Sequence, residues 1–213
     1  MAKFLVDVMT LFPEVFELTM NVSVIGRAIK KGIIDLKCHQ IRDYSDNKHK
    51  KVDDYPYGGG EGMIMTAEPI FQTFMHIKKE RGVLPYLIMM SPRGKILDES
   101  MIKRIRTLKN ISILCGRYEG VDQRLIDEIV DEEISIGNYV VSGGELPAMV
   151  FLDSILRTID GVLSSSDCYI NESHFNGKLE HSQYTRPRVW HGREVPEVLL
   201  SGNHEKINKW KMK

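Results

Sequence analysis

The chain has 213 residues, enough for one large domain or for one domain with a small companion. Hydrophobic residues make up 42% and charged residues 27%, as in an ordinary globular protein, and the formal net charge is zero. This balance argues weakly against a protein dedicated to nucleic acid, and no apolar run approaches the ~20 residues of a membrane span. The N-terminus is typical of a strand rather than a signal peptide, so we expect a cytoplasmic protein.

The first third of the chain alternates between predicted strands and helices. Residues 4–12 are almost continuously apolar, as in a strand that is covered on both faces. Pro13 suits the start of a short helix. Ser23 is predicted to cap a second helix that Gly32 ends, and residues 33–41 are typical of another strand. Residues 42–62 are too long and polar for a tight connection, and loops of this length are usually functional or disordered.

The pattern continues with a predicted helix over residues 68–79 and a strand over residues 85–90. This strand is expected to end in the turn SPRG at residues 91–94. Asp98 is predicted to cap the next helix. This alternation of strands and helices indicates an α/β protein with a parallel sheet and helices on its faces.

Residues 111–159 contain the clearest candidate for a ligand site. Two short apolar runs, 111–115 and 134–136, each stop at a glycine, Gly116 and Gly137. The second glycine loop leads into a long apolar helix with Pro147 in its first turn. In an open α/β sheet, ligands bind at the carboxyl ends of the strands, which is where these loops are predicted to lie.

Several common site patterns are missing from the sequence. There is no GxxxxGK[ST] phosphate loop, no HExxH and no GxSxG, and the seven histidines are too scattered to indicate a metal centre. The three cysteines form no CxxC pair. No glycine loop follows the first strand, which disfavours a Rossmann cofactor site.

Long motifs in this region and beyond it resemble one protein family. They are CGRYEGVDQR and DEEISIGNYVVSGGELPAM in residues 115–149, NKHKKVDDYPYGGGEGM at 47–63, QYTRP at 183–187 and VLLSGNHEKINKW at 198–210. In this order they closely resemble the bacterial tRNA (guanine-N1)-methyltransferases, which belong to the SPOUT class. These enzymes modify the guanosine just 3′ of the anticodon, at position 37.

The resemblance implies a fold that periodicity cannot reveal. The family folds its parallel sheet into a deep trefoil knot, followed by a small C-terminal helical domain. We therefore expect a knotted domain over residues 1–163, a flexible linker over 164–178 and a small tRNA-binding domain over 179–213. The family usually continues beyond this point, so a natural end and a truncation both stay open. The resemblance also implies a homodimer with its active site at the subunit interface.

The family's cofactor is S-adenosyl-L-methionine, the methyl donor, and the resemblance places its pocket in three loops. The matching positions in this chain are Met89, Met90, Ser91, Pro92, Gly94, Gly116, Tyr118, Glu119, Ser135, Ile136, Gly137, Asn138, Tyr139, Val140, Val141, Gly143, Gly144 and Pro147. Glycine permits close approach of the backbone to a ligand. We expect no dedicated metal ligand, and any Mg²⁺ would bind together with the substrate.

The resemblance also implies the catalytic residues. The family's general base is a carboxylate four residues before the Tyr of YTRP, which is Glu180 here, although family members often carry Asp. The matching cation, which stabilises the guanine anion, is Arg157.

The tRNA substrate is expected to contact basic and aromatic residues outside the cofactor loops. These are Lys48, Lys50, Lys51, Tyr184, Arg186, Arg188, Ser201, Asn203 and His204. Two other functions stay open at this point. They are a non-catalytic knotted RNA-binding protein and a knotted methyltransferase that acts on another RNA.

Overall fold

The structure is a computed structural model that describes residues 3–165, 167–170, 172–175, 177 and 179–211. The chain divides into two compact units, unit 1 at Met1–Ser165 and unit 2 at Ser166–Lys213. Among the described residues, no helix combines the length and the apolar character that a membrane span requires.

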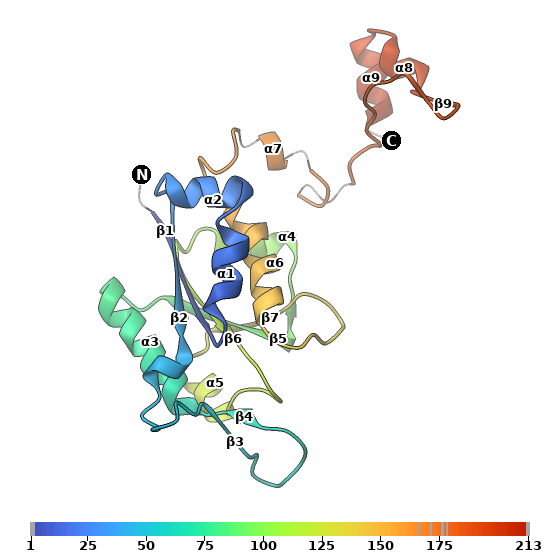
Figure 1. Ribbon diagram of the computed structural model, residues 1–213. Coiled ribbons are helices and arrows are strands. Elements are labelled where there is room, and N and C mark those ends of the chain that lie inside the picture. Colours follow the sequence, from blue (N-terminus) through green and yellow to red (C-terminus); the bar gives the residue numbers. More distant parts are fainter. Residues whose placement is uncertain (1–2, 166, 171, 176, 178, 212–213) are drawn as a thin grey trace. The chain divides into compact units, whose positions relative to one another are not determined.

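Unit 1 is built on a five-stranded sheet whose paired strands all run parallel (Figure 1). The strand order is β2-β1-β6-β5-β7. The strands are β1 (Phe4–Thr10), β2 (Ile34–Gln40), β5 (Tyr86–Ile96), β6 (Asn110–Cys115) and β7 (Glu132–Ser135). The predicted parallel α/β architecture is therefore confirmed.

Helices cover both faces of this sheet. One face packs against α1 (Pro13–Met20), α2 (Ser23–Lys30), α4 (Glu99–Ile105) and α6 (Glu145–Leu156), and the other against α3 (Ala67–Arg81) and α5 (Gln123–Ile129). Successive residues of a strand point to opposite faces of the sheet. Ile88 and Met90 therefore pack in the core under α1, α2, α4 and α6, while Leu87 and Met89 pack in the core under α3 and α5. Burial on both faces explains why β1, β6 and the first half of β5 are mostly apolar.

The helix ends agree with the sequence in part. The Asp98 side chain accepts a hydrogen bond from the Met101 amide at 2.8 Å and caps α4 as predicted. The prediction for Ser23 is wrong, because Val22 is the N-cap of α2 and its carbonyl accepts the first helical bond, from the Gly26 amide. Ser23 is the first helical residue, and no side-chain hydrogen bond caps this helix.

The long polar segment after β2 has a structure of its own. It begins with the 3₁₀ helix η1 (Ile41–Tyr44), and β3 (Asp53–Asp54) then pairs antiparallel with β4 (Ile64–Met65). Ile41, Val52 and Met65 are buried and anchor the segment to the core beneath α3. The loop between β3 and β4 contains the glycine-rich run at residues 58–62 of the motif at 47–63.

A buried charged network joins β1, β2 and the end of α3. The Asp7 carboxylate accepts hydrogen bonds from Arg81 Nε at 2.8 Å and Nη2 at 3.1 Å, and lies 2.7 Å from His39 Nε2. Burial acts to raise the pKa of Asp7, but the hydrogen bonds from His39 and Arg81 outweigh it and lower the pKa below its ordinary value. The carboxylate is therefore held ionised inside the protein.

Unit 2 is small and contains short elements. These are α7 (Asp167–Ile170), β8 (Val189–Trp190), β9 (Arg193–Glu194), α8 (Glu197–Leu200) and α9 (His204–Lys211). β8 and β9 form an antiparallel pair, and the Trp210 ring lies 5.7 Å from His181 and 6.2 Å from Tyr184. The segment predicted as a linker contains α7, and its residues 166, 171, 176 and 178 lie outside those described.

Candidate functional site

A cavity of about 1280 Å³ lies where β6 and β7 lead into their loops, beside the middle of β5. β6 ends at Cys115 and continues into Gly116, while β7 ends at Ser135 just before Ile136 and Gly137. β5 lies between these two strands and contributes Met89 and Met90 to the wall. Because the strands are parallel, these segments meet at one edge of the sheet, as the sequence predicted.

Most of the residues predicted to bind the cofactor line this cavity. They are Met89, Met90, Ser91, Pro92, Gly116, Tyr118, Glu119, Ser135, Ile136, Tyr139, Val140, Val141, Gly143, Gly144 and Pro147. The other three, Gly94, Gly137 and Asn138, are not part of the lining. Gly94 instead packs against the backbone of Glu133 and Ile134, where a side chain would clash. Its role is to let β5 and β7 approach each other.

The SPRG segment is part of a strand, so the prediction that the strand ends at Met90 is wrong. β5 continues to Ile96 and pairs with β7 on both sides of the motif. The register shifts between Met90 and Lys95, so both residues are opposite Ile134 and residues 91–94 bulge from the ladder. The bulge explains why Ser91 and Pro92 still reach the cavity although the strand goes on.

The two glycine loops touch each other through their backbones. The Gly144 amide donates a hydrogen bond to the Gly116 carbonyl at 2.8 Å. A Cβ atom on Gly144 would lie 2.7 Å from Cys115 Cα and 2.8 Å from the Gly116 nitrogen, closer than real Cβ atoms come. Glycine is therefore required at position 144 for the start of α6 to pack against the end of β6.

An ion pair holds the same two loops together. Arg117 Nε lies 2.8 Å from Glu145 Oε2, although the angle falls short of a hydrogen bond. The other oxygen of Glu145 accepts a hydrogen bond from the Thr10 hydroxyl at 2.9 Å, and the Arg117 guanidinium lies over the Phe12 ring. The buried carboxylate thus links β1, the loop after β6 and the first turn of α6.

A second wall of the cavity comes from the segment around β3 and β4, which the sequence analysis missed. It contributes Asp54, Tyr55, Pro56, Tyr57, Thr66 and Glu68. Backbone hydrogen bonds from Glu119 N to Met63 O and from Met65 N to Gly120 O, both 2.9 Å, attach this hairpin to the loop after β6. The unusual length of the loop at residues 42–62 and the motif at 47–63 were the signals in the sequence that could have located this wall.

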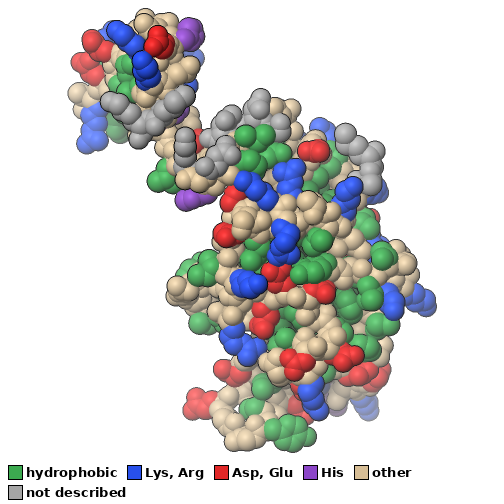
Figure 2. All heavy atoms as spheres, turned by 180° about the vertical axis from the view of Figure 1, so that it is seen from behind, with side chains coloured by type: hydrophobic (Ala, Val, Ile, Leu, Met, Phe, Trp, Pro, Cys, Tyr) green, Lys and Arg blue, Asp and Glu red, His purple; other side chains and the backbone are tan. Residues whose placement is uncertain are grey.

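The basic residues before β3 lie outside the cavity lining. Lys50 Nζ donates to the Asp43 carbonyl at 3.2 Å, Lys51 pairs with Asp54 at 3.3 Å, and Lys48 is exposed. Figure 2 shows acidic and basic side chains interspersed over the face of the molecule seen there. These lysines remain candidates for phosphate contact at the surface.

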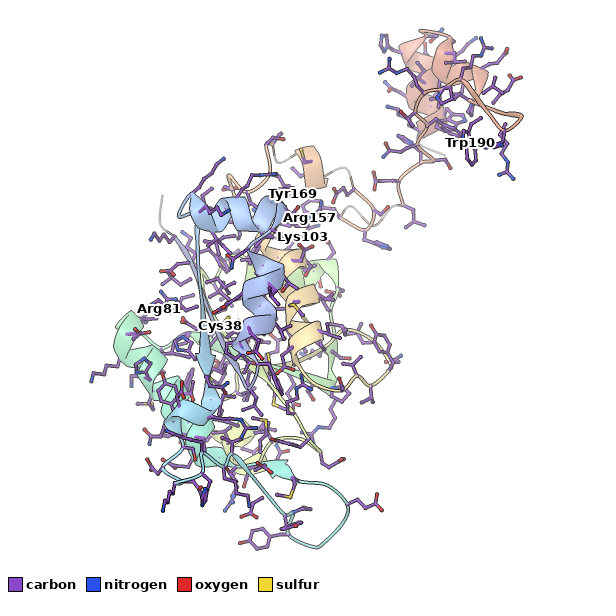
Figure 3. The ribbon with its side chains drawn as sticks, in the orientation of Figure 1. Cys38, Arg81, Lys103, Arg157, Tyr169 and Trp190 are labelled. Atoms are coloured by element: carbon purple, nitrogen blue, oxygen red, sulfur yellow. The ribbon has the colours of Figure 1, made fainter. Side chains whose placement is uncertain are left out.

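The two predicted catalytic residues lie in different units. Arg157 is half-buried at the C-terminal end of α6 in unit 1 (Figure 3). Glu180 is exposed in unit 2, where its Oε2 accepts from the Ser173 amide at 3.4 Å and its Oε1 accepts from Gln183 Nε2 at 3.2 Å. The Glu180 amide in turn donates to the Ser173 hydroxyl at 3.0 Å. The Glu180 carboxylate is therefore held by two residues of its own unit, Ser173 and Gln183.

The predicted RNA-contacting residues of unit 2 are all exposed. Tyr184, Arg186 and Arg188 lie before the β8–β9 hairpin. The helix predicted after residues 201–204 is present as α9, beginning at His204. The Asn203 side chain accepts from the Lys206 amide at 3.1 Å, and the Ser201 hydroxyl accepts from the Asn203 amide at 3.2 Å. Asn203 thus accepts from an amide in the first turn of α9, so part of the N-terminal hydrogen-bonding capacity of the helix is used internally.

Fold and cavity together define an α/β protein with a nucleotide-sized, glycine-lined pocket at the strand ends. The model of the family tRNA (Guanine-1)-methyltransferase TrmD matches residues 4–213. A tRNA (guanine-N(1)-)-methyltransferase from Ruminiclostridium cellulolyticum is 53% identical over 206 residues, or 97% of this chain and 88% of that protein. One from Clostridioides difficile is 52% identical over 96% of this chain and 89% of that protein. The chain belongs to the bacterial tRNA (guanine-N1)-methyltransferase family.

A solved structure supports this assignment. The crystal structure of the tRNA (m1G37) methyltransferase from Aquifex aeolicus matches with a TM-score of 0.83 and 35% sequence identity. The match covers 99% of this chain and 88% of that one. It therefore extends over residues of both units.

Proposed function

We propose that this protein transfers a methyl group from S-adenosylmethionine to N1 of the guanosine immediately 3′ of the anticodon in tRNA. The observation that carries the proposal is the family match over residues 4–213, which includes both the cavity and unit 2. The name of the Aquifex enzyme specifies the same nucleotide, position 37.

The cavity suits a nucleoside-like ligand. Its lining combines glycine backbone at positions 116, 143 and 144 with apolar side chains such as Ile136, Val141 and Pro147. Backbone groups of such loops can hydrogen-bond an adenine edge and a ribose, while the apolar side chains contact the rings. When bound, S-adenosylmethionine supplies a methyl group that its sulfonium already activates.

The protein then has two tasks, alignment of the guanine and removal of its N1 proton. Alignment supplies several kcal/mol in reactions of this kind. We assign proton removal to Glu180, whose carboxylate the Ser173 amide and Gln183 orient. Loss of the proton places negative charge on the N1–C6–O6 system, which the guanidinium of Arg157 stabilises. Mg²⁺, where it takes part, enters with the substrate.

The family fold and assembly complete the proposal. A deep trefoil knot is consistent with the way the loop before α6 bonds to the loop after β6, through Gly144 and Gly116. A homodimer is supported by apolar side chains exposed on the neighbouring helices α1 and α6, namely Leu18, Leu146 and Val150. In this dimer, Glu180 of one protomer serves the cavity of its partner.

We assign tRNA binding mainly to the small C-terminal unit. Arg186 and Arg188 contact phosphate, Tyr184 stacks on a base, and the N-terminus of α9 at His204 approaches a further phosphate. Lys48, Lys50 and Lys51 add phosphate contacts from unit 1. The exposure of all these residues supports this assignment.

The test is methyl transfer from radiolabelled S-adenosylmethionine to two tRNA transcripts, with G or A directly 3′ of the anticodon. Label should enter only the G transcript, and Glu180→Gln should slow transfer ~10²–10⁴-fold. Glu172→Gln is the comparison variant, because Glu172 directly precedes Ser173, whose amide and hydroxyl contact Glu180.

The alternatives give different results in the same assay. If Glu172→Gln loses transfer while Glu180→Gln keeps it, the base is Glu172. Equal labelling of both transcripts would mean that another nucleotide is the target. Binding of cofactor and tRNA without any transfer would favour a non-catalytic RNA-binding protein.

A further inference from the structure

Three potential metal ligands from β2 and α3 come together away from the cofactor cavity. His39 on β2, and His76 and Glu80 on α3, each offer one ligand atom, and these atoms lie within 4.8 Å of one another. None of the three residues lines the large cavity. No local pattern predicts this cluster, because His39 is 37 positions before His76 and the packing of α3 beside β2 brings them together.

The two helical ligands are arranged as a metal site requires. His76 and Glu80 are one helical turn apart and therefore project from the same face of α3. His76 Nε2 lies 3.7 Å from Glu80 Oε2, and both side chains are half-exposed. Small rotations of these two side chains can bring their ligand atoms to the distances of ~2.0–2.2 Å from a shared ion that zinc requires.

The third ligand is already fixed by a buried carboxylate. His39 Nε2 lies 2.7 Å from Asp7 Oδ1, so this nitrogen is engaged and Nδ1 is left to coordinate. Metal-binding histidines almost always donate their other ring nitrogen to a carboxylate, a carbonyl or water in this way. Arg81, at the C-terminal end of α3 (Figure 3), holds Asp7 through Nε and Nη2 and also bonds to Asp35 of β2 at 3.0 Å. The His39 imidazole is thus oriented by Asp7, which Arg81 in turn holds in place.

We propose that His39, His76 and Glu80 form a binding site for a divalent transition-metal ion of the zinc type. Two imidazoles and one carboxylate are a ligand set that zinc accepts, with water in the fourth position. Lys37 Nζ lies 3.5 Å from Glu80 Oε2 and swings away when the ion binds, since its side chain is half-exposed. The ion connects the C-terminal half of α3 to β2, which is an edge strand of the sheet. Its role is structural stabilisation of this edge.

The experiment uses the full-length protein after treatment with a chelator, and titrates Zn²⁺ by calorimetry and Co²⁺ by visible absorption. We expect one equivalent to bind, with the d–d bands of a four- or five-coordinate Co²⁺ ion, and the melting temperature to rise with Zn²⁺. His76→Ala and Glu80→Gln should each weaken binding ~10-fold or more. Both positions are half-exposed, so neither change should prevent folding. His49→Ala, which removes an exposed histidine of the same unit, is the control and should bind like the wild type.

Three outcomes would overturn the proposal. They are no binding to the wild type, unchanged binding in either variant, and a thiolate charge-transfer band showing that a cysteine such as Cys38 holds the Co²⁺. A Zn²⁺-dependent rise in melting temperature that disappears in both variants but persists in His49→Ala would support it. Methyl transfer is not part of this test, so its outcome is independent of the proposed catalytic function.

Discussion

Arg117 and Glu145 form an ion pair, with Nε and Oε2 2.8 Å apart, that joins the loop after β6 to the first turn of α6. The Glu145 carboxylate is almost completely buried and also accepts the Thr10 hydroxyl. A buried charge is costly unless it is paired, so Arg117, Glu145 and Thr10 depend on one another for their stability. Because both joined loops line the cavity, the pair determines the shape of the proposed cofactor site.

We expect Glu145→Gln to destabilise unit 1 by about 2 kcal/mol, because it leaves Arg117 without its charge partner in a partly buried position. Urea denaturation followed by circular dichroism measures this. Glu128→Gln, on the exposed side of α5, should change stability by less than about 0.5 kcal/mol. Equal stability of the two variants would mean that the ion pair contributes nothing.

A methyl group at Gly144 should be far more damaging than one at Gly116. Gly144→Ala places Cβ 2.7 Å from the backbone of Cys115 and should cost about 2–3 kcal/mol, with loss of cofactor binding. Gly116→Ala places Cβ 3.7 Å from Met89 Cε and Val121 Cγ2, an ordinary contact, and should keep the fold. Thermal unfolding and calorimetric titration with S-adenosylmethionine compare them. A stable Gly144→Ala protein would contradict the close approach of the two loops.

A charge on the exposed face of α6 should separate the proposed dimer. Val150 is 51% exposed on α6, so Val150→Glu is compatible with the folded protomer but buries a charge in the interface. Light scattering coupled to size-exclusion chromatography should give a monomer for this variant and a dimer for the wild type. Val83→Glu, at a residue of similar exposure (54%) in the loop after α3, should stay dimeric. A dimeric Val150→Glu protein would place the interface elsewhere.

The three cysteines should differ sharply in reactivity. Burial raises the pKa of Cys38 to about 12, with the negative charges of Glu17 and Asp7 adding to the effect, and burial also raises the pKa of Cys115. A raised pKa keeps a thiol protonated and unreactive at pH 8, because the thiolate is the nucleophile. Cys168 is exposed, so one thiol of the native protein should react rapidly with a disulfide reagent. Three should react in denaturant, and rapid modification of two native thiols would contradict the packing of β2 or β6.

Much of the architecture follows from the sequence alone. The apolar runs, the glycines that end them and the capping Asp98 predicted a parallel α/β sheet with its site at the carboxyl ends of the strands. These features are local, and period, propensity and capping are properties of neighbouring residues. The long motifs predicted three cofactor loops, and most residues of these loops line the cavity. The small C-terminal domain was expected from the family resemblance and not from any local pattern.

Tertiary structure decided what depends on residues far apart in the chain. The bulge that carries Ser91 and Pro92 exists because β5 continues along β7, and the cavity wall at Asp54 and Tyr55 exists because a hairpin bonds to the loop after β6. The contact of Thr10 with Glu145 spans 135 positions, and the meeting of His39 with His76 depends on α3 packing beside β2. No local pattern encodes such pairs, because the free energy that forms them comes from burial of the whole core.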